Sequence, residues 1–292
     1  MRDGQGLDGA YKSKLRANSA GGLRIAYLGP RGTFCEEAAR NFSPSRANLI
    51  PCSDIAEVFQ SVGNGTADLG IVPLENSIEG SVGLTLDLLL ESDLKICGEV
   101  DLRIKHNLIV KPGMEIENIR ILASHPQALA QCRKFISSKL PNVEKIETSS
   151  TSRAVELIKD MEGAAAIGTE LAAELNGMKI LESGIEDNEN NFTRFLAISK
   201  YDSPATGSDK TSIIFSVENA PGALYKALEE FAKRGINLTK IESRPTKRRP
   251  WEYIFYVDFE GHRENEECKE ALACLKRKAS FLKILGSYPA AR

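Results

Sequence analysis

The stretch Arg24-Ile25-Ala26-Tyr27-Leu28-Gly29-Pro30-Arg31-Gly32-Thr33-Phe34-Cys35-Glu36 points to the fold class of this chain. Its first five residues form a mostly apolar run that predicts a β-strand, and the glycines and proline that follow predict a tight turn. Thr33 and Glu36 then stand three residues apart, as in a capping box that opens a helix. A strand leading through a short loop into a helix is the repeating unit of α/β proteins, so we expect an α/β domain.

The same alternation continues along the chain and predicts a series of strands at 25–28, 48–51, 69–72, 95–97, 108–110, 120–123, 145–148, 165–167 and 195–199. Helices should fill most intervals, among them 54–62, which begins with an Asp-x-x-Glu cap, and 152–161. Strands that alternate with helices favour parallel sheets with crossover helices.

Residues 202–210 contain Pro204, Gly207 and two serines and interrupt this pattern, so they predict an interdomain linker. A separate unit follows, with the order βαββαβ of a ferredoxin-like domain. Its predicted elements are a strand at 211–217, a helix at 221–233, strands at 236–243 and 253–259, a helix at 264–278 and a strand at 281–286. Lys247-Arg248-Arg249 then falls between two strands and predicts a solvated hairpin tip.

Composition excludes several classes of function. The chain has 292 residues, enough for about two domains, and its 38 Lys and Arg against 40 Asp and Glu leave a net charge of −2. No overall field would recruit nucleic acid or an acidic membrane surface. Six cysteines without a C-x-x-C spacing, together with three histidines, predict neither a zinc site nor a disulfide framework. We therefore expect no metal.

Residues 1–23 are polar and lack the apolar core of a signal peptide. We expect them to be a flexible N-terminal extension of a cytoplasmic protein, with the plastid stroma as the alternative if the source is a photosynthetic eukaryote. No stretch approaches the roughly 20 apolar residues that span a bilayer, so no membrane partner is expected.

The segment 190–195 sets Thr193 beside Arg194 where a polar loop becomes an apolar strand. A guanidinium binds planar anions with two hydrogen bonds, and a hydroxyl can donate to a neighbouring group. The pair indicates an acidic small-molecule substrate, although a Thr-Arg step also suits an ordinary strand edge.

Three further segments precede predicted helices. Residues 29–36 end in the Thr-x-x-Glu box, Ser124 to Gln127 form a Ser-x-x-Gln box, and residues 77–81 precede the apolar helix 84–90. Helix amino termini at the carboxyl ends of strands present free N–H groups to anions, so these segments are expected to converge on one cleft. The alternative is that they only cap their helices.

Taken in order, these residues resemble the prephenate dehydratases and the closely related arogenate dehydratases, from about residue 24 to residue 289. The matching motifs are Gly29-Pro30-Arg31-Gly32-Thr33, Pro73-Leu74-Glu75-Asn76-Ser77, Ser124-His125-Pro126-Gln127-Ala128-Leu129 and Thr193-Arg194-Phe195. The C-terminal unit resembles an ACT regulatory domain.

The resemblance implies a two-lobed catalytic domain of the type II periplasmic-binding-protein kind at 24–201. One lobe would hold 24–99 and 191–199, the other 102–181, with crossings near 99–105 and 181–190. A linker at 202–210 and an ACT domain at 211–289 would follow.

The resemblance also implies the roles of residues. Thr193 would donate to the departing hydroxyl of prephenate and Arg194 would bind a carboxylate, with Phe195 completing the catalytic motif. Substrate contacts would come from Thr33, Glu75, Asn76, Ser77, Ser124, His125 and Gln127. His125 and Glu75 are the other candidate acids and rank below Thr193. The reaction needs no cofactor.

L-Phenylalanine would bind as an effector between ACT domains of neighbouring subunits, in a homodimer or homotetramer. Asn219 and Pro221 are expected to start a helix whose terminus receives a carboxylate, and Gly222 to allow close approach. The implied effector residues are Asn219, Gly222, Ala223, Leu224, Asn237, Leu238, Glu242, Ser243 and Arg244.

Other functions stay open at this point. Arogenate differs from prephenate by an amine in place of a side-chain carbonyl, and the sequence does not separate the two substrates. A binding-protein-like cleft with an ACT domain would also suit a non-catalytic sensor of aromatic metabolites. A fused chorismate mutase domain is not expected, because residues 1–23 are too few for its long helices.

Overall fold

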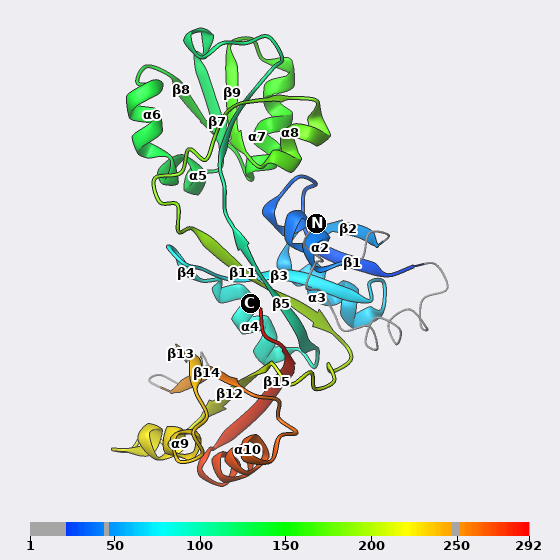
Figure 1. Cartoon of the computed structure of the whole chain (residues 1–292), viewed down its shortest axis with the longest axis vertical. Coiled ribbons are helices and arrows are strands. Elements are labelled where there is room, and N and C mark those ends of the chain that lie inside the picture. Colours follow the sequence, from blue (N-terminus) through cyan, green and yellow to red (C-terminus); the bar gives the residue numbers. More distant parts are fainter. Residues whose placement is uncertain (1–21, 44–46, 247–251, 292) are drawn as a thin grey trace.

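The computed structural model describes residues 22–43, 47–246 and 252–291. The predictions for the N-terminal extension before residue 22 and for the Lys247-Arg248-Arg249 hairpin tip lie outside the described residues. Three bodies follow one another along the long axis of the molecule (Figure 1), and the first part of the chain forms the middle one.

The middle body, here called the first lobe, is built on a sheet with the strand order β2-β1-β3-β11-β5, and a short strand β4 pairs with β3. Its strands are β1 (Arg24–Leu28), β2 (Asn48–Cys52), β3 (Leu69–Asn76), β4 (Gly80–Ser81), β5 (Lys95–Arg103) and β11 (Phe192–Ser199). Its helices are α2 (Phe34–Phe42), α3 (Ile55–Asn64) and α4 (Gly83–Glu91).

The second lobe carries a sheet with the order β10-β6-β9-β7-β8. Its strands are β6 (Asn107–Val110), β7 (Ile121–Ser124), β8 (Glu144–Glu147), β9 (Ala164–Gly168) and β10 (Lys179–Ser183). The helices are α5 (Pro126–Gln131), α6 (Arg133–Lys139), α7 (Thr151–Leu157) and α8 (Glu170–Asn176), with short 3-10 turns at Ile116–Asn118 and Ile158–Asp160.

The two-lobed α/β class is confirmed, but the expectation of parallel sheets is wrong for part of each lobe. β1 runs parallel to β2 and β3, whereas β11 is antiparallel to both β3 and β5. In the second lobe β6 is antiparallel to β9 and β10. In the first lobe the reason is the double crossing. β5 leaves this lobe at its carboxyl end, and β11 re-enters at that same end between β3 and β5, so β11 runs antiparallel to both neighbours.

Each strand predicted for the two lobes falls on an observed strand, although β3 and β5 run several residues further. The sequence did not predict β4 or β10. The predicted helix at 152–161 is α7 followed by the 3-10 turn. The chain crosses between the lobes after β5 and again between β10 and β11.

The C-terminal domain has the predicted order βαββαβ. Its elements are β12 (Asp209–Ser216), α9 (Ala223–Ala232), β13 (Leu238–Pro245), β14 (Tyr253–Glu260), α10 (Glu266–Lys278) and β15 (Phe281–Pro289). The antiparallel sheet has the order β13-β14-β12-β15, as in ferredoxin-like domains. β12 begins at Asp209, inside the segment predicted as a linker.

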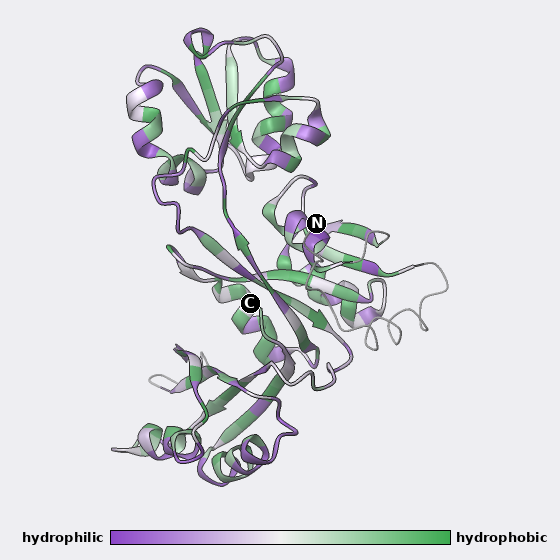
Figure 2. Cartoon of the chain, in the orientation of Figure 1, coloured by the Kyte–Doolittle hydropathy of each residue, from purple (hydrophilic) through white to green (hydrophobic). Residues whose placement is uncertain are grey.

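The C-terminal sheet is buried on both faces. One face packs on α9 and α10 through Phe215, Val257 and Phe259. The other face contributes Ile214 and Tyr256 to the core of the first lobe, and the Tyr256 hydroxyl donates to the carbonyl of Leu86 in α4 at 2.9 Å. Figure 2 shows the apolar residues along the strands and the inner helix faces. The C-terminal domain and the first lobe therefore share a core.

Candidate functional site

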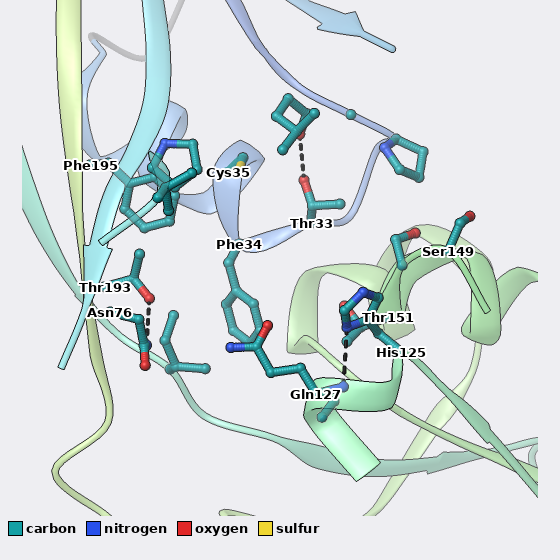
Figure 3. A pocket seen from close by; sticks show the side chains of 18 of the residues that line it. Thr33, Phe34, Cys35, Asn76, His125, Gln127, Ser149, Thr151, Thr193 and Phe195 are labelled. Atoms are coloured by element: carbon teal, nitrogen blue, oxygen red, sulfur yellow. Dashed lines mark hydrogen bonds between the residues drawn. The ribbon is translucent and has the colours of Figure 1, made fainter. Parts of the chain in front are cut away.

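A cavity of about 450 Å³ lies between the two lobes. Thr193, Asn76 and Phe195 face it from the first lobe, and His125 and Gln127 face it from the second (Figure 3). Phe34, at the start of α2, projects between the two walls. Two of the three segments predicted to converge, 29–36 and 124–127, thus contribute residues to one cavity, whereas none of residues 77–81 lines it.

Thr193 has the geometry of a hydrogen-bond donor to a ligand. Its side chain lies at the start of β11, opposite Asn76 at the end of β3. Asn76 Nδ2 donates to Thr193 Oγ1 at 2.9 Å, and the side-chain oxygen Oδ1 of Asn76 accepts from the backbone N–H groups of Ile78 and Glu79. The described contacts give Oγ1 a donor and no acceptor, so its own hydrogen is available to a bound molecule.

Behind Thr193 runs a chain of side-chain hydrogen bonds, here called the relay, made of Thr193, Asn76, Asn191, Gln131 and His106. Asn76 Nδ2 donates to Asn191 Oδ1 at 2.7 Å, and Asn191 Nδ2 donates to Gln131 Oε1 at 3.0 Å. His106 Nε2 lies 3.0 Å from the same Gln131 oxygen. Since Gln131 belongs to α5, the relay joins Thr193 to the second lobe.

His106 is neutral in this setting. Its Nε2 faces an acceptor and therefore carries the proton, while its Nδ1 is buried and has no partner among the described residues. Burial lowers the pKa of His106, although the hydrogen bond with Gln131 opposes the change. The thiol of Cys35, which also lines the cavity, has its pKa raised to about 12 by burial. Neither group supplies a charge to the cavity.

Helix starts border the cavity. Thr33, His125 and Ser150 are the N-cap residues of α2, α5 and α7, and each accepts from a backbone N–H of its own helix. Val82, the N-cap residue of α4, also lines the cavity. Among its described lining residues there is no Arg or Lys. An anion bound here would therefore meet backbone N–H groups and hydroxyls.

Two of the predicted helix starts form differently. Ser124 is not the cap of α5: it is fully buried at the end of β7, and its hydroxyl donates to the carbonyl of Ile167 at 2.8 Å. The cap is His125, whose Nδ1 accepts from the Gln127 N–H. Ser77 lies in the β3–β4 hairpin, donates to the carbonyl of Asn190 and accepts from the Phe192 N–H. Both serines form hydrogen bonds to backbone groups, and neither lines the cavity.

Arg194 does not line the cavity, so its described contacts give no support to the prediction that it binds a substrate carboxylate. Neighbouring residues of a strand face opposite sides, so Arg194 points away from Thr193, toward the C-terminal domain. Its guanidinium lies 3.2 Å from Glu75 and 3.5 Å from Asp101 and from Asp258. Burial lowers the pKa of Arg194, but the surrounding carboxylates outweigh this effect and leave it raised. Glu75 lies outside the cavity as well.

Of the predicted catalytic and substrate residues, the cavity brings together Thr33, Asn76, His125, Gln127, Thr193 and Phe195. It leaves out Glu75, Ser77, Ser124 and Arg194. Residues that were not predicted also line it, among them Phe34, His106, Gln131, Ser149, Ser150 and Thr151. Two of them had a signal: Ser150 precedes a helical pattern, and Gln131 lies one helical turn beyond Gln127.

A second cavity, of about 440 Å³, lies in the C-terminal domain. The predicted effector residues Asn219, Ala223 and Leu224 line it, together with Tyr253 and Phe255 of β14. Gly222 is the N-cap of α9 with φ of 76°, and an added Cβ would meet nothing within 4 Å. This left-handed backbone conformation favours glycine, and the expected close approach of an effector at Gly222 stays a prediction. The helix begins at Ala223, beyond Asn219 and Pro221.

The remaining predicted effector residues lie elsewhere. Asn237 donates to Glu260 at 3.1 Å, Leu238 packs on the core of the C-terminal domain, and Ser243 is exposed. Glu242 and Arg244 face the first lobe: Glu242 accepts from the Ser81 hydroxyl at 2.5 Å, and Arg244 lies 3.2 Å from Asp87. The predicted effector residues therefore do not gather in one place within a single chain, and the expected site between ACT domains of neighbouring subunits stays a prediction.

The fold and the cavity define a class: a two-lobed α/β domain with a cavity between its lobes, followed by a ferredoxin-like domain. The family model for prephenate dehydratase matches residues 25–203, and that for the ACT domain matches residues 211–273. The chain belongs to the prephenate dehydratase family, whose members are hydro-lyases.

Comparisons with individual relatives support this family assignment. A bifunctional chorismate mutase/prephenate dehydratase of Aquifex aeolicus is 51% identical over 92% of this chain and 74% of that protein. A prephenate dehydratase of Methanocaldococcus jannaschii is 45% identical over 91% of this chain and 97% of that protein. A prephenate dehydratase of Arthrobacter aurescens, solved in complex with L-Phe, superposes with a TM-score of 0.85 at 36% identity, covering 92% and 90% of the two chains. Plant arogenate dehydratases also match.

Among the described residues, no group of three or more His, Cys, Asp or Glu side chains could hold a metal ion. No helix in the described part of the chain is long and apolar enough to cross a membrane.

Proposed function

We propose that this chain converts prephenate to phenylpyruvate by decarboxylative dehydration. The observation that carries the proposal is the Thr193–Asn76 pair, which faces a cavity bounded by helix starts from both lobes. Prephenate carries two carboxylates and a ring hydroxyl, and these are the groups that such a cavity can bind.

The substrate supplies most of the driving force. When the ring carboxylate leaves as carbon dioxide, the electron pair of the broken C–C bond moves into the ring and the C–O bond to the hydroxyl breaks. The departing oxygen takes up a proton from solvent and leaves as water. The ring becomes aromatic. The protein has to orient the ring and stabilise the negative charge that develops on the departing oxygen.

In this proposal Thr193 donates a hydrogen bond to the departing hydroxyl. Asn76 holds the Thr193 oxygen, so that its hydrogen is directed into the cavity. The helix starts at Thr33, His125 and Ser150 bind the carboxylates through backbone N–H groups, since no Arg or Lys is among the described residues lining the cavity. Gln127 and Thr151 add polar contacts.

L-Phenylalanine is proposed as the allosteric effector, bound at the C-terminal domain, and the protein is proposed to work as a homodimer or homotetramer in the cytoplasm. The cavity lined by Asn219, Ala223 and Leu224 has the size for an amino acid and ends at the start of α9. If the effector prefers one arrangement of the lobes, its binding shifts the population toward that arrangement. Turnover that is equal with and without saturating L-phenylalanine would remove this part of the proposal.

The substrate is tested by assaying the purified chain with prephenate and with arogenate side by side. We expect turnover of prephenate to phenylpyruvate. Turnover of arogenate alone would replace the proposal with an arogenate dehydratase. Binding of either compound without product would favour a sensor of aromatic metabolites.

A further inference from the structure

A group of charged side chains lies behind the catalytic strands, between the first lobe and the ACT domain. It contains Arg194, Glu75 and Asp101 of the first lobe and Lys240, Glu242 and Asp258 of the ACT domain, and is here called the interdomain charge cluster. The cluster occupies the face of β11 and β3 opposite to the face that lines the catalytic cavity.

The ACT strand β13 presents one face to this cluster. Its residues alternate between half-buried and exposed, so that Lys240, Glu242 and Arg244 all point toward the first lobe. The Lys240 ammonium donates to Glu75 and lies 3.2 Å from Glu242. Because Glu242 also accepts from Ser81 at 2.5 Å, β13 holds both sides of the β3–β4 hairpin.

The cluster and the catalytic pair share the same two strand ends. In the register of β11 with β3, Thr193 lies opposite Asn76, and Arg194 lies opposite Glu75. The ladder shifts directly after Arg194, so backbone pairing alone holds this point less firmly than a regular ladder. A restraint on Glu75 and Arg194 is therefore transmitted through the backbone to Asn76 and Thr193.

The contacts are shielded enough to act as restraints. The side chains of Lys240, Arg194 and Glu75 are 11%, 22% and 25% exposed. Charged pairs that are partly withdrawn from water lose less to screening than surface pairs do. Asp258 of β14 is buried and lies 3.5 Å from Arg194, which adds a second contact from the ACT domain.

We propose that Lys240 of the ACT domain is a positioning residue for Thr193: by holding Glu75 against Arg194, it fixes the strand ends that carry Thr193 and Asn76. The inference rests on the proposed dehydratase function. It makes the C-terminal domain part of the support of the catalytic site, in addition to any role in binding an effector, and it gives Arg194 a place in that support.

The test is the steady-state kinetics of Lys240→Met with prephenate. We expect kcat to fall about fivefold with KM unchanged within about twofold, because a small displacement of a catalytic group costs rate more than binding. Lys240→Arg should restore most of kcat. The matched control is Lys95→Met: the Lys95 ammonium donates to the carbonyl of Ile284 at 3.0 Å across the same domain boundary, and none of its described contacts involves Glu75 or Arg194.

A double-mutant cycle separates positioning from general loss of stability. Glu75→Gln and the double variant Glu75→Gln/Lys240→Met should reduce kcat no further than Lys240→Met does, because both changes break the same link. The inference is overturned if Lys240→Met keeps the wild-type kcat, if Lys95→Met loses as much, or if the two changes add independently. A wild-type chain that turns over neither prephenate nor arogenate would overturn the proposed function and this inference with it, whereas an active wild type with an unaffected Lys240→Met overturns the inference alone.

Discussion

At the scale of single residues, the adjacent residues Thr193 and Arg194 lie on opposite faces of one strand: Thr193 lines the cavity, and Arg194 contacts carboxylates on the other face. The sequence could predict that the pair lies at a strand start where the chain returns to the first lobe. It could not predict that the Arg194 guanidinium would lie on the face of the sheet opposite to the cavity. That outcome depends on Glu75, Asp101 and Asp258, which are distant in sequence and are brought to Arg194 by pairing with β3 and β5 and by the ACT domain.

The relay predicts a function for Gln131. Gln131→Met removes the acceptor shared by Asn191 and His106, so Asn76 and Thr193 lose part of their orientation. We expect kcat to fall about tenfold with little change in KM, within the roughly 100-fold that a misplacement of about 1 Å costs. Initial-rate kinetics with prephenate measure this change. The exposed Gln60 of α3 provides the control Gln60→Met, and equal kcat values for the two variants would contradict the role of the relay.

His106 predicts a dependence of stability on pH. Burial lowers its pKa in the folded state below the ordinary value of about 6.5, so the unfolded chain binds the proton more tightly. The contribution of His106 to stability is therefore fully present above about pH 6.5, and it is lost progressively as the pH falls from there through the lower pKa of the folded state. Urea unfolding at about pH 7.5 and about pH 5.5 should show a lower midpoint at the lower pH. His106→Gln should reduce this difference, and an unchanged difference in His106→Gln would count against the assignment.

At the scale of elements, the capping pattern at Thr33 predicted the start of α2 correctly, and the Ser124 pattern did not predict α5. The two cases differ in where the capping residue lies relative to the preceding strand. Thr33 lies in a loop beyond the end of β1, whereas Ser124 is still part of β7 and is committed to the carbonyl of Ile167 in β9. A local pattern cannot reveal a competing partner that belongs to a distant strand.

Gly32 lies where the first lobe contacts α8 of the second lobe, and its lack of a side chain allows this close contact. It has φ of +81°, and an added Cβ would lie 2.9 Å from Ala172 Cα of α8, in the second lobe. Gly32→Ala should lower stability by about 1–2 kcal/mol for the left-handed backbone and also hold the lobes apart, which raises KM for prephenate. The control is Gly177→Ala, with φ of +65° and nothing within 4 Å of the added Cβ. Gly177→Ala should cost similar stability without changing KM, and equal KM values for the two variants would refute the lobe contact.

At the scale of the whole molecule, the sequence predicted the two lobes and the ferredoxin-like domain but not the contact between that domain and the first lobe. One signal was available. β12 contains the run Ile213, Ile214 and Phe215, whose side chains alternate between faces, and an apolar run of this kind predicts a strand buried on both faces. The helices α9 and α10 cover only one face of the C-terminal sheet, and the other face packs on the first lobe.

Catalysis by the whole molecule, as proposed, depends on the hydroxyl of Thr193 acting on the departing oxygen of the substrate. The most direct measurement compares kcat for prephenate in the wild type, Thr193→Ser and Thr193→Val. We predict that Thr193→Ser keeps most of kcat, while Thr193→Val, which has the same shape without the hydroxyl, loses about 100-fold or more with substrate affinity retained. A Thr193→Val variant that turns over prephenate at the wild-type rate would contradict this role of the hydroxyl.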